Sequence, residues 1–335
     1  MKLFKQSILF LSILIVLAAC NNSPKELKIH KVVGEAQGTY YAISYFDKQN
    51  RELKPQFDSL LKAFDMSASN YQEQSILSKV NRNDSVVLDD IFIGNYNLAM
   101  RVSKETNGDF DITVRPLVEA WGFGKTQAED MDSAIVDEIL EFVGYQKVRL
   151  ENGRIIKDDP RLQLDFDALA QGYSVDVLAM FLESIGVKHY LIDVGGEIYA
   201  SQSKPNGDLW KVGVETPKDS AAYGEDLAAV LTLSIRGMAT SGNYRKFYIK
   251  DGIKYAHTIN PHSGYPISSR LLSATVIAKT AAEADAYATS FMVMGLEKSK
   301  EFVSKHPELE VYFIFSNSDG DYEYFASEGL KDVVQ

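Results

Sequence analysis

The chain has 335 residues, of which 45% are hydrophobic, and its formal charge at pH 7 is −11. This length allows either one large domain or two lobes, and the composition supplies enough apolar side chains for a large core. The acidic balance argues against a surface that binds nucleic acid or an anionic membrane.

Residues 1–19 are predicted to be an export signal. Lys2 and Lys5 precede an apolar run over residues 8–17, and small residues lead up to Cys20. The run is shorter than the roughly 20 apolar residues that a transmembrane helix needs. The four residues ending at Cys20 resemble a bacterial lipobox, which would make Cys20 the lipid-modified first residue of the mature chain. The alternative is an ordinary cleaved signal with an incidental cysteine.

The rest of the chain divides into a short tether and one folded part. Residues 20–30 are expected to form the lipidated cysteine and a polar tether, and residues 31–330 the folded domain. Cys20 is the single cysteine of the chain, so no internal disulfide is expected. We therefore expect an exported cell-envelope lipoprotein that faces the periplasm. Palmitate-type acyl chains would hold it to the inner or the outer membrane.

Helices and strands are predicted in an irregular order. Spacing and capping signals predict helices at about residues 55–65, 91–106, 132–143 and 168–185. Apolar and aromatic runs predict strands at residues 39–46, 189–194, 209–215, 228–235, 245–250, 253–259, 272–278 and 310–316, with a tight turn at 251–252. Because strict βαβ alternation is absent, the pattern favours an α+β fold over a Rossmann sheet.

The segment over residues 280–289 carries the clearest chemical signal. Thr280 and Glu283 have the spacing of a capping box, which predicts that a helix begins there. Asp285 and Thr289 would then lie one turn apart on one face. Their oxygens, together with a backbone carbonyl, would suit Mg²⁺. The alternative is an alanine-rich core helix with a buried, hydrogen-bonded aspartate.

Two segments rich in glycine and small polar residues could contact an anion. Gly195 and Gly196 follow an apolar strand and would let backbone N–H groups approach a phosphate, although a tight turn explains them better. Thr240, Ser241 and Gly242 offer hydroxyls and exposed backbone suited to phosphate or ribose. A turn at the end of a strand explains these three residues nearly as well.

Three further segments allow more than one interpretation. In the proline-containing loop 257–266, His257 could relay protons near neutral pH or make a structural hydrogen bond. Residues 108–124 interleave aromatics with glycines, which suits a flat ligand or a buried tryptophan corner. Residues 165–176 place three aspartates at the entrance of a predicted helix, where acids stabilise the helix N-terminus without any function.

Several common catalytic motifs do not occur in the sequence. The chain contains no HExxH, CxxC, GxSxG or P-loop pattern. This argues against a zincin, a thiol redox protein, an α/β-hydrolase and a P-loop NTPase.

Taken in order, the segments resemble the ApbE family of FAD:protein FMN transferases, from about Val33 to Phe325. The resemblance implies a single large T-fold-like domain with mixed or antiparallel sheets and flanking helices. The motifs that carry it are GTYY at 38–41, SNY at 69–71, FD with T and PL over 110–117, WGFG at 121–124, ALAQGY at 168–173, GGE at 195–197, ATSG at 239–242, HTINP at 257–261, and ADA with a threonine over 284–289.

The family resemblance also implies an activity. FAD would be the substrate, bound with Mg²⁺ beside its pyrophosphate, and its FMN part would pass to a Ser or Thr hydroxyl of a target flavoprotein with release of AMP. Membrane redox-pump subunits are among the targets it suggests. The alternatives are a FAD pyrophosphatase that releases FMN and AMP, and a non-catalytic FAD-binding lipoprotein.

Roles for individual residues follow from the resemblance. Asp285 and Thr289, with the carbonyl of Ala170, would bind the metal, and Asp285 would thereby be catalytic. Tyr71 would lie near the flavin and favour transfer over hydrolysis, while His257 would assist proton removal from the acceptor hydroxyl. The FAD contacts that the resemblance implies are Tyr71, Gly108, Asp109, Phe110, Trp121, Asp176, Thr240, Ser241, Gly242 and His257.

Overall fold

The structure is a computed structural model that describes residues 27–124, 131–217, 226–243, 247–250 and 253–330. The predicted signal, the lipidation site at Cys20 and the turn at 251–252 therefore lie outside the described residues. Among the residues that are described, no helix is both long and apolar enough to cross a bilayer.

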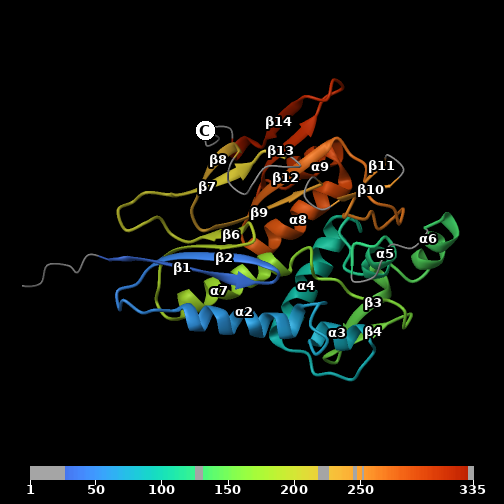
Figure 1. Ribbon diagram of the computed structural model, residues 1–335, viewed down its shortest axis with the longest axis horizontal. Helices are drawn as coiled ribbons and strands as arrows, with labels where there is room; N and C mark the ends of the chain where they lie inside the picture. The colour runs from blue at the N-terminus through green and yellow to red at the C-terminus, as the bar shows by residue number, and fades with distance from the viewer. Residues whose placement is uncertain (1–26, 125–130, 218–225, 244–246, 251–252, 331–335) are drawn as a thin grey trace, which may run out of the picture.

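One eight-stranded sheet runs through the molecule (Figure 1), and every neighbouring pair of its strands is antiparallel. This architecture confirms the expected α+β fold with antiparallel sheets. In their order across the sheet, the strands are β1 (Ile29–Ala36), β2 (Thr39–Phe46), β5 (His189–Val194), β6 (Glu197–Ala200), β9 (Arg236–Gly242), β12 (Leu271–Ala278), β13 (Glu310–Ser316) and β14 (Tyr322–Ala326).

The described residues also form three two-stranded sheets, and each is antiparallel. In one of them Lys250 pairs with Ile253, so the two strands of the predicted hairpin are present on either side of residues 251–252. The pairs are β3 (Val148–Glu151) with β4 (Arg154–Lys157), β7 (Trp210–Glu215) with β8 (Leu227–Leu233), and β10 (Phe247–Lys250) with β11 (Ile253–Ala256).

Helices cover the sheet and form a separate group beside it (Figure 1). Helix α7 packs Val175, Leu178 and Leu182 beneath β2 and β5, and these three residues recur at helical spacing on one face of the helix. The helices are α2 (Lys54–Ala68), α3 (Ile76–Asn81), α4 (Asp90–Glu105), α5 (Arg115–Ala120), α6 (Ser133–Leu140), α7 (Ala170–Ser184), α8 (Ala281–Met294) and α9 (Leu296–Lys305), with short 3₁₀ turns at Tyr145–Lys147 and Glu328–Leu330.

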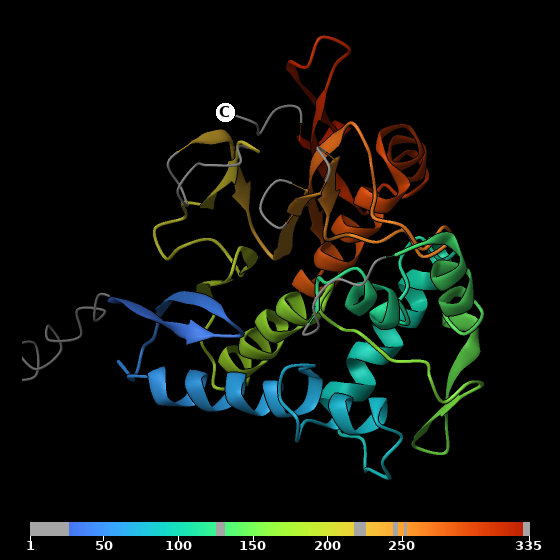
Figure 2. The same cartoon turned by 45° about the vertical axis from the view of Figure 1, so that its right-hand side comes forward.

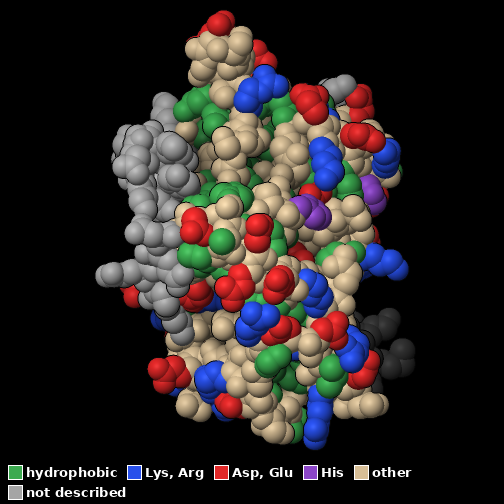
Figure 3. All heavy atoms as spheres, turned by 90° about the vertical axis from the view of Figure 1, so that its right-hand side faces the viewer, with side chains coloured by type: hydrophobic (Ala, Val, Ile, Leu, Met, Phe, Trp, Pro, Cys, Tyr) green, Lys and Arg blue, Asp and Glu red, His purple; other side chains and the backbone are tan. Residues whose placement is uncertain are grey.

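The sheet joins distant parts of the chain. Tyr41 of β2 pairs with Val194 of β5, so these two strands are neighbours in the sheet. In the sequence, the whole segment from α2 to α7 separates them. Figure 2 shows α7 and α8 meeting near the centre of the molecule, between the β1–β2 hairpin and the strands that follow β9. On the face shown in Figure 3, acidic and basic side chains are interspersed, so neither sign of charge dominates there.

The sequence did not predict several elements, among them β1, β14, α9 and β9. The most informative omission is β9, whose sequence RGMATSG contains two glycines and an alanine, residues that are depleted in strands. Thr240, Ser241 and Gly242 lie in this strand, paired with β12, and not in a turn beyond it. Tertiary pairing with β6 and β12 overrides the weak local preference.

Glycines allow the first turn of α8 to pack closely against its neighbours. A Cβ on Gly237 of β9 would overlap the backbone of Thr280 and Ala281, and a Cβ on Gly172 of α7 would overlap the carbonyl of Ala281. The alanines of α8 are buried against these surfaces. The start of α8 is therefore held between β9 and α7 at backbone contact distance.

We predict that Gly237→Ala lowers the free energy of unfolding by about 2–3 kcal/mol, because the added methyl group meets backbone that cannot rotate away. Urea denaturation measures this change. Gly213→Ala is the matched control in a strand, since its Cβ would meet only the end of the flexible, exposed Leu227 side chain. Equal stabilities for the two variants would contradict the packing described for α8.

Candidate functional site

Helices α7 and α8 cap each other. The Asp176 carboxylate on α7 accepts hydrogen bonds from the N–H groups of Ala281 (2.9 Å) and Ala282 (3.0 Å), the first two residues of α8. In return, the Asp285 carboxylate on α8 accepts one from the N–H of Gly172 (3.1 Å) in the first turn of α7. These N–H groups have no partner within their own helix, so each helix satisfies donors that the other leaves open.

The interpretation that the aspartates at residues 165–176 stabilise the N-terminus of α7 was wrong for Asp165 and Asp176. The residue before α7 is Leu169, which makes no side-chain cap, and the first turn of the helix contains no acid. Asp165 instead pairs with the buried Arg115, and Asp176 caps α8. Local sequence could not reveal this, because both partners lie far away in the chain.

The surroundings of Asp176 and Asp285 disfavour their charged forms. Removal from water raises the pKa of Asp176 to about 7, although its two backbone hydrogen bonds oppose the shift. Burial also raises the pKa of Asp285, and the nearby negative charge of Asp176 adds to this effect. Because the pKa of Asp176 exceeds its value of 3.8 in an unfolded chain, its contribution to folding stability is full below pH 4 and is lost as the pH rises through 7.

The predicted start of α8 is confirmed, since the Thr280 hydroxyl accepts a hydrogen bond from the N–H of Glu283 (3.1 Å). Asp285 and Thr289 consequently lie one turn apart on the same face. The Thr289 hydroxyl is 3.2 Å from that of Ser241, so β9 borders this face of the helix. Asp285 is a buried, hydrogen-bonded residue of an alanine-rich helix, as the second hypothesis stated, and its role as a metal ligand stays a prediction.

The oxygens at this junction fit Mg²⁺. Among the described residues, no three His, Cys, Asp or Glu side chains gather into a metal-binding group. Mg²⁺ does not require such a group, because it commonly takes one or two carboxylates and fills its other positions with water and phosphate oxygens. Asp285 would supply the carboxylate, and the Thr289 hydroxyl, together with the Ala170 carbonyl that the family resemblance implies, would be the neutral oxygens of such a set.

The turn between β5 and β6 lies against the start of α7. Gly195 and Gly196 have φ angles of +65° and +109°, and the Gly196 N–H donates to the Asp193 carboxylate (2.9 Å). The predicted tight turn is thus confirmed. A Cβ on Gly195 would overlap the side-chain amide of Gln171 and lie 2.7 Å from Thr39 Cγ2. Only glycine lets this turn approach α7 so closely.

Tyr71 stands at the surface beside a buried ionic network. Its side chain is 57% exposed, its hydroxyl donates to Asp167 (3.4 Å), and the guanidinium of Arg115 lies 5.9 Å from its ring centroid. Arg115 is 3% exposed and binds Asp165 (3.2 Å) and Glu119. Arg115 was not among the predicted site residues, although a lone arginine within the apolar run ITVRPLV indicates a buried cation that needs acidic partners.

A polar groove of about 620 Å³ opens next to this network. Asn70 connects the two, since its amide donates to Asp165 (3.0 Å) and its carbonyl oxygen accepts from Asn81 (3.0 Å). The groove is lined by Asn70, Glu73, Gln74, Ser78, Asn81, Arg82, Arg115, Glu119 and Gln163.

The loop over residues 257–266 is held at two points. Asp109, which is buried, binds His262 (3.2 Å) and Lys298 (2.6 Å). The indole N–H of Trp121 donates to the carbonyl of Gly264 (2.8 Å). The structure thus brings the predicted segment around residue 110 against the histidine-containing loop.

The aromatic rings of that segment are covered by protein. Phe110 is 2% exposed within the main core, and Trp121 is 7% exposed, which is the buried tryptophan corner that the sequence allowed. Gly108 has a φ of +86° at the turn after α4, and His257 is partly buried just after β11. Contacts of these residues and of Asp176 with FAD stay predictions.

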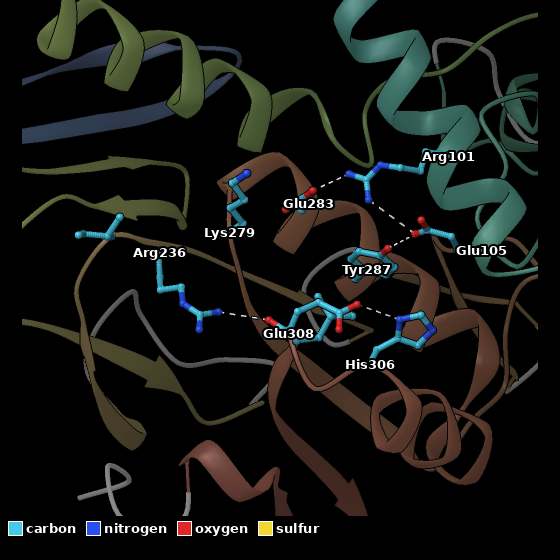
Figure 4. Close-up of a pocket in the computed structure, with 10 residues that line it drawn as sticks. Arg101, Glu105, Arg236, Lys279, Glu283, Tyr287, His306 and Glu308 are labelled. Carbon is cyan, nitrogen blue, oxygen red and sulfur yellow. Dashed lines mark hydrogen bonds and ion pairs between the residues drawn. The ribbon is translucent and has the colours of Figure 1, made fainter.

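A second cavity, of about 240 Å³, lies on the other side of α8 (Figure 4). Glu283 and Tyr287 face it, and they are half a turn away from Asp285 and Thr289 on the helix. Its charged groups bind one another, since Arg101 pairs with Glu283 and the Tyr287 hydroxyl donates to Glu105. This cavity is therefore separate from the junction of α7 and α8.

Comparison with known proteins agrees with this geometry. The model of the ApbE family matches residues 37–313 of the chain. The chain belongs to the ApbE family. The FAD:protein FMN transferase of Vibrio cholerae is 32% identical and covers 95% of this chain, with 96% of its own length matched. The FAD:protein FMN transferase of Escherichia coli K12 is 33% identical over 90% of this chain and 89% of its own length.

Solved structures place the fold in the same ApbE family. The flavin transferase ApbE from Vibrio cholerae matches with a TM-score of 0.81 and 29% identity, covering 92% of this chain and 99% of that one. The apo form of the flavinyl transferase ApbE from Pseudomonas stutzeri matches with the same TM-score and 26% identity. The resemblance inferred from the motifs is thus confirmed, together with the single ApbE-like domain.

Proposed function

We propose that this protein is a Mg²⁺-dependent FAD:protein FMN transferase. It takes FAD as substrate, attaches FMN through a phosphoester bond to a Ser or Thr of a target flavoprotein, and releases AMP. The observation that carries the proposal is the position of Asp285. This buried carboxylate lies at the N-terminus of α7, beside the Thr289 hydroxyl, in a member of a family whose curated relatives have this activity.

The junction of α7 and α8 offers several groups for a pyrophosphate. The helix dipole of α7 favours negative charge at its N-terminus. The turn at Gly195 and Gly196 and the hydroxyl of Ser241 border the same junction, whereas the Thr240 hydroxyl pairs with that of Thr275 (2.9 Å) on the other face of β9. When bound by Asp285, Thr289 and the carbonyl of Ala170, Mg²⁺ would neutralise charge on the two phosphates.

Transfer requires one bond to form and one to break. The acceptor hydroxyl oxygen attacks the phosphorus on the FMN side, the bond to the AMP phosphate breaks, and AMP departs with the bridging oxygen. His257 assists by taking the proton of the acceptor hydroxyl. Water attacking the same phosphorus would yield free FMN, so exclusion of water by the exposed Tyr71 ring favours transfer over hydrolysis.

The location of the protein is part of the proposal. The leader and Cys20 support an exported lipoprotein held in the cell envelope, with periplasm-facing flavoproteins, membrane redox subunits among them, as targets. The residues assigned to the site all lie beyond residue 69, well after the tether. The folded domain should therefore be active without the lipid anchor.

We predict that Asp285→Asn lowers the rate of FMN transfer by about 10²-fold or more, because it removes the charge that holds the metal. The asparagine oxygen can still accept from the Gly172 N–H, so the fold should survive. Transfer is measured by mass spectrometry of the acceptor protein, and excess EDTA should reproduce the loss in the unmodified enzyme.

The control for this variant is Asp137→Asn on the exposed face of α6, which should change nothing. Transfer at the normal rate by Asp285→Asn, or by the unmodified enzyme in EDTA, would remove the metal from the mechanism.

Tyr71→Asn should shift the products from protein-bound FMN toward free FMN and AMP, because losing the ring admits water beside the reacting phosphorus. Tyr71→Phe keeps the ring and should keep the products of the unmodified enzyme. Chromatography of free FMN alongside mass spectrometry of the acceptor measures the ratio. The role of Tyr71 is refuted if the asparagine variant leaves this ratio unchanged.

Cys20→Ser should yield a soluble or a signal-retaining protein without acyl chains, because acyl chains contribute about 0.8 kcal/mol per buried CH₂ and are the anchor of the processed chain. A chain that begins at Lys25 should retain full transfer activity when purified. Fractionation of cells tests the first expectation. A membrane-bound Cys20→Ser protein that has lost its signal would contradict lipid anchoring, and an inactive shortened chain would show that the tether takes part in catalysis.

A further inference from the structure

The polar groove of about 620 Å³ is unlike a site for the flavin ring. None of the side chains that line it is aromatic or aliphatic. A flat, largely apolar ring system binds where aromatic and aliphatic walls cover its faces. The groove instead offers amides, carboxylates, guanidinium groups and a hydroxyl, which are groups that recognise another hydrogen-bonding chain.

Two of the groove's amides are available for such recognition. The side chains of Gln74 and Gln163 make no hydrogen bond to any residue that the structure describes. A glutamine amide has both donors and an acceptor, which is the combination that pairs with the N–H and C=O groups of an extended peptide. Arg82 and Glu73 add one charge of each sign at exposed positions.

The groove adjoins the proposed reaction site. Asn70 lines the groove and directly precedes Tyr71, and Arg115 lines it while contacting the Tyr71 ring. Arg115 also binds Asp165, five residues before α7 begins at Ala170. A molecule in the groove would therefore lie beside the residue that the proposed function assigns to separating transfer from hydrolysis.

We propose that this groove binds the segment of the target flavoprotein that carries the acceptor Ser or Thr. The inference rests on the proposed function and adds the place where its second substrate docks. The bound segment is extended and hydrophilic, with its backbone paired to the amides of Gln74 and Gln163. Its hydroxyl then enters past Tyr71 toward the junction of α7 and α8.

The single cysteine of the chain makes a selective test possible. In the Cys20→Ser protein, Gln74→Cys introduces one thiol at the groove, which a bulky maleimide reagent can modify. Gln56→Cys is the matched control, because Gln56 is an exposed glutamine on α2 and does not line the groove. The acceptor is a purified domain of a redox protein that carries FMN on threonine in its native host.

Modification of Gln74→Cys should raise the KM for the acceptor domain about tenfold or more. The KM for FAD and the slow release of free FMN without acceptor should stay unchanged. The modified Gln56→Cys protein should behave like the unmodified enzyme. Gln163→Leu, which keeps the size of the side chain and removes the amide, should show the same selective rise in the acceptor KM.

Two results would overturn docking in the groove. A rise in the KM for FAD would mean that the groove holds the flavin, and an unchanged acceptor KM in both variants would mean that the acceptor docks elsewhere. Failure of the proposed function would give a different result from these two, because the unmodified enzyme would transfer no FMN to the acceptor. In that case the docking proposal would also be wrong.

Discussion

The exchange of caps between α7 and α8 is the constraint on which the rest of the structure depends. Each helix begins where the other supplies an aspartate. Backbone N–H groups in the first turn of both helices therefore lack these hydrogen bonds until the two helices meet. Gly172 and Gly237 allow that meeting at backbone contact distance. The same contact brings the Asp285 carboxylate, the Thr289 hydroxyl and the first turn of α7 to one place. Structural capping and proposed chemistry therefore use the same atoms.

This arrangement explains why two acids can be kept away from water. Asp176 and Asp285 each face backbone N–H groups, which partly compensate for the loss of hydration, yet burial still raises both pKa values. A positive charge nearby would stabilise the charged forms of these two buried carboxylates. In the proposed function, a divalent cation at Asp285 would supply that positive charge.

The sequence predicted local structural features more completely than tertiary contacts. The capping box at Thr280, the turn at Gly195 and the limits of β5 depend on neighbours in the chain, and each was predicted. Strand β9 was missed because its pairing overrides poor propensity. The network around Arg115 and the cap by Asp176 join residues 50 and 105 positions apart. Neither local pattern nor the family resemblance indicated these two contacts, because they depend on how distant segments pack.

The pairing of β2 with β5 has a consequence for how the chain folds. Tyr41 meets Val194, so β2 finds its second neighbour only after more than a hundred further residues are available. Closing so long a loop costs chain entropy before the strand pairing compensates for it, and such contacts form slowly. Gly172 and Asp285, which are hydrogen-bonded, are also more than a hundred residues apart in the sequence. The central sheet and the helix junction should therefore be late events in folding, and a partly synthesised chain presents β2 with an unpaired edge.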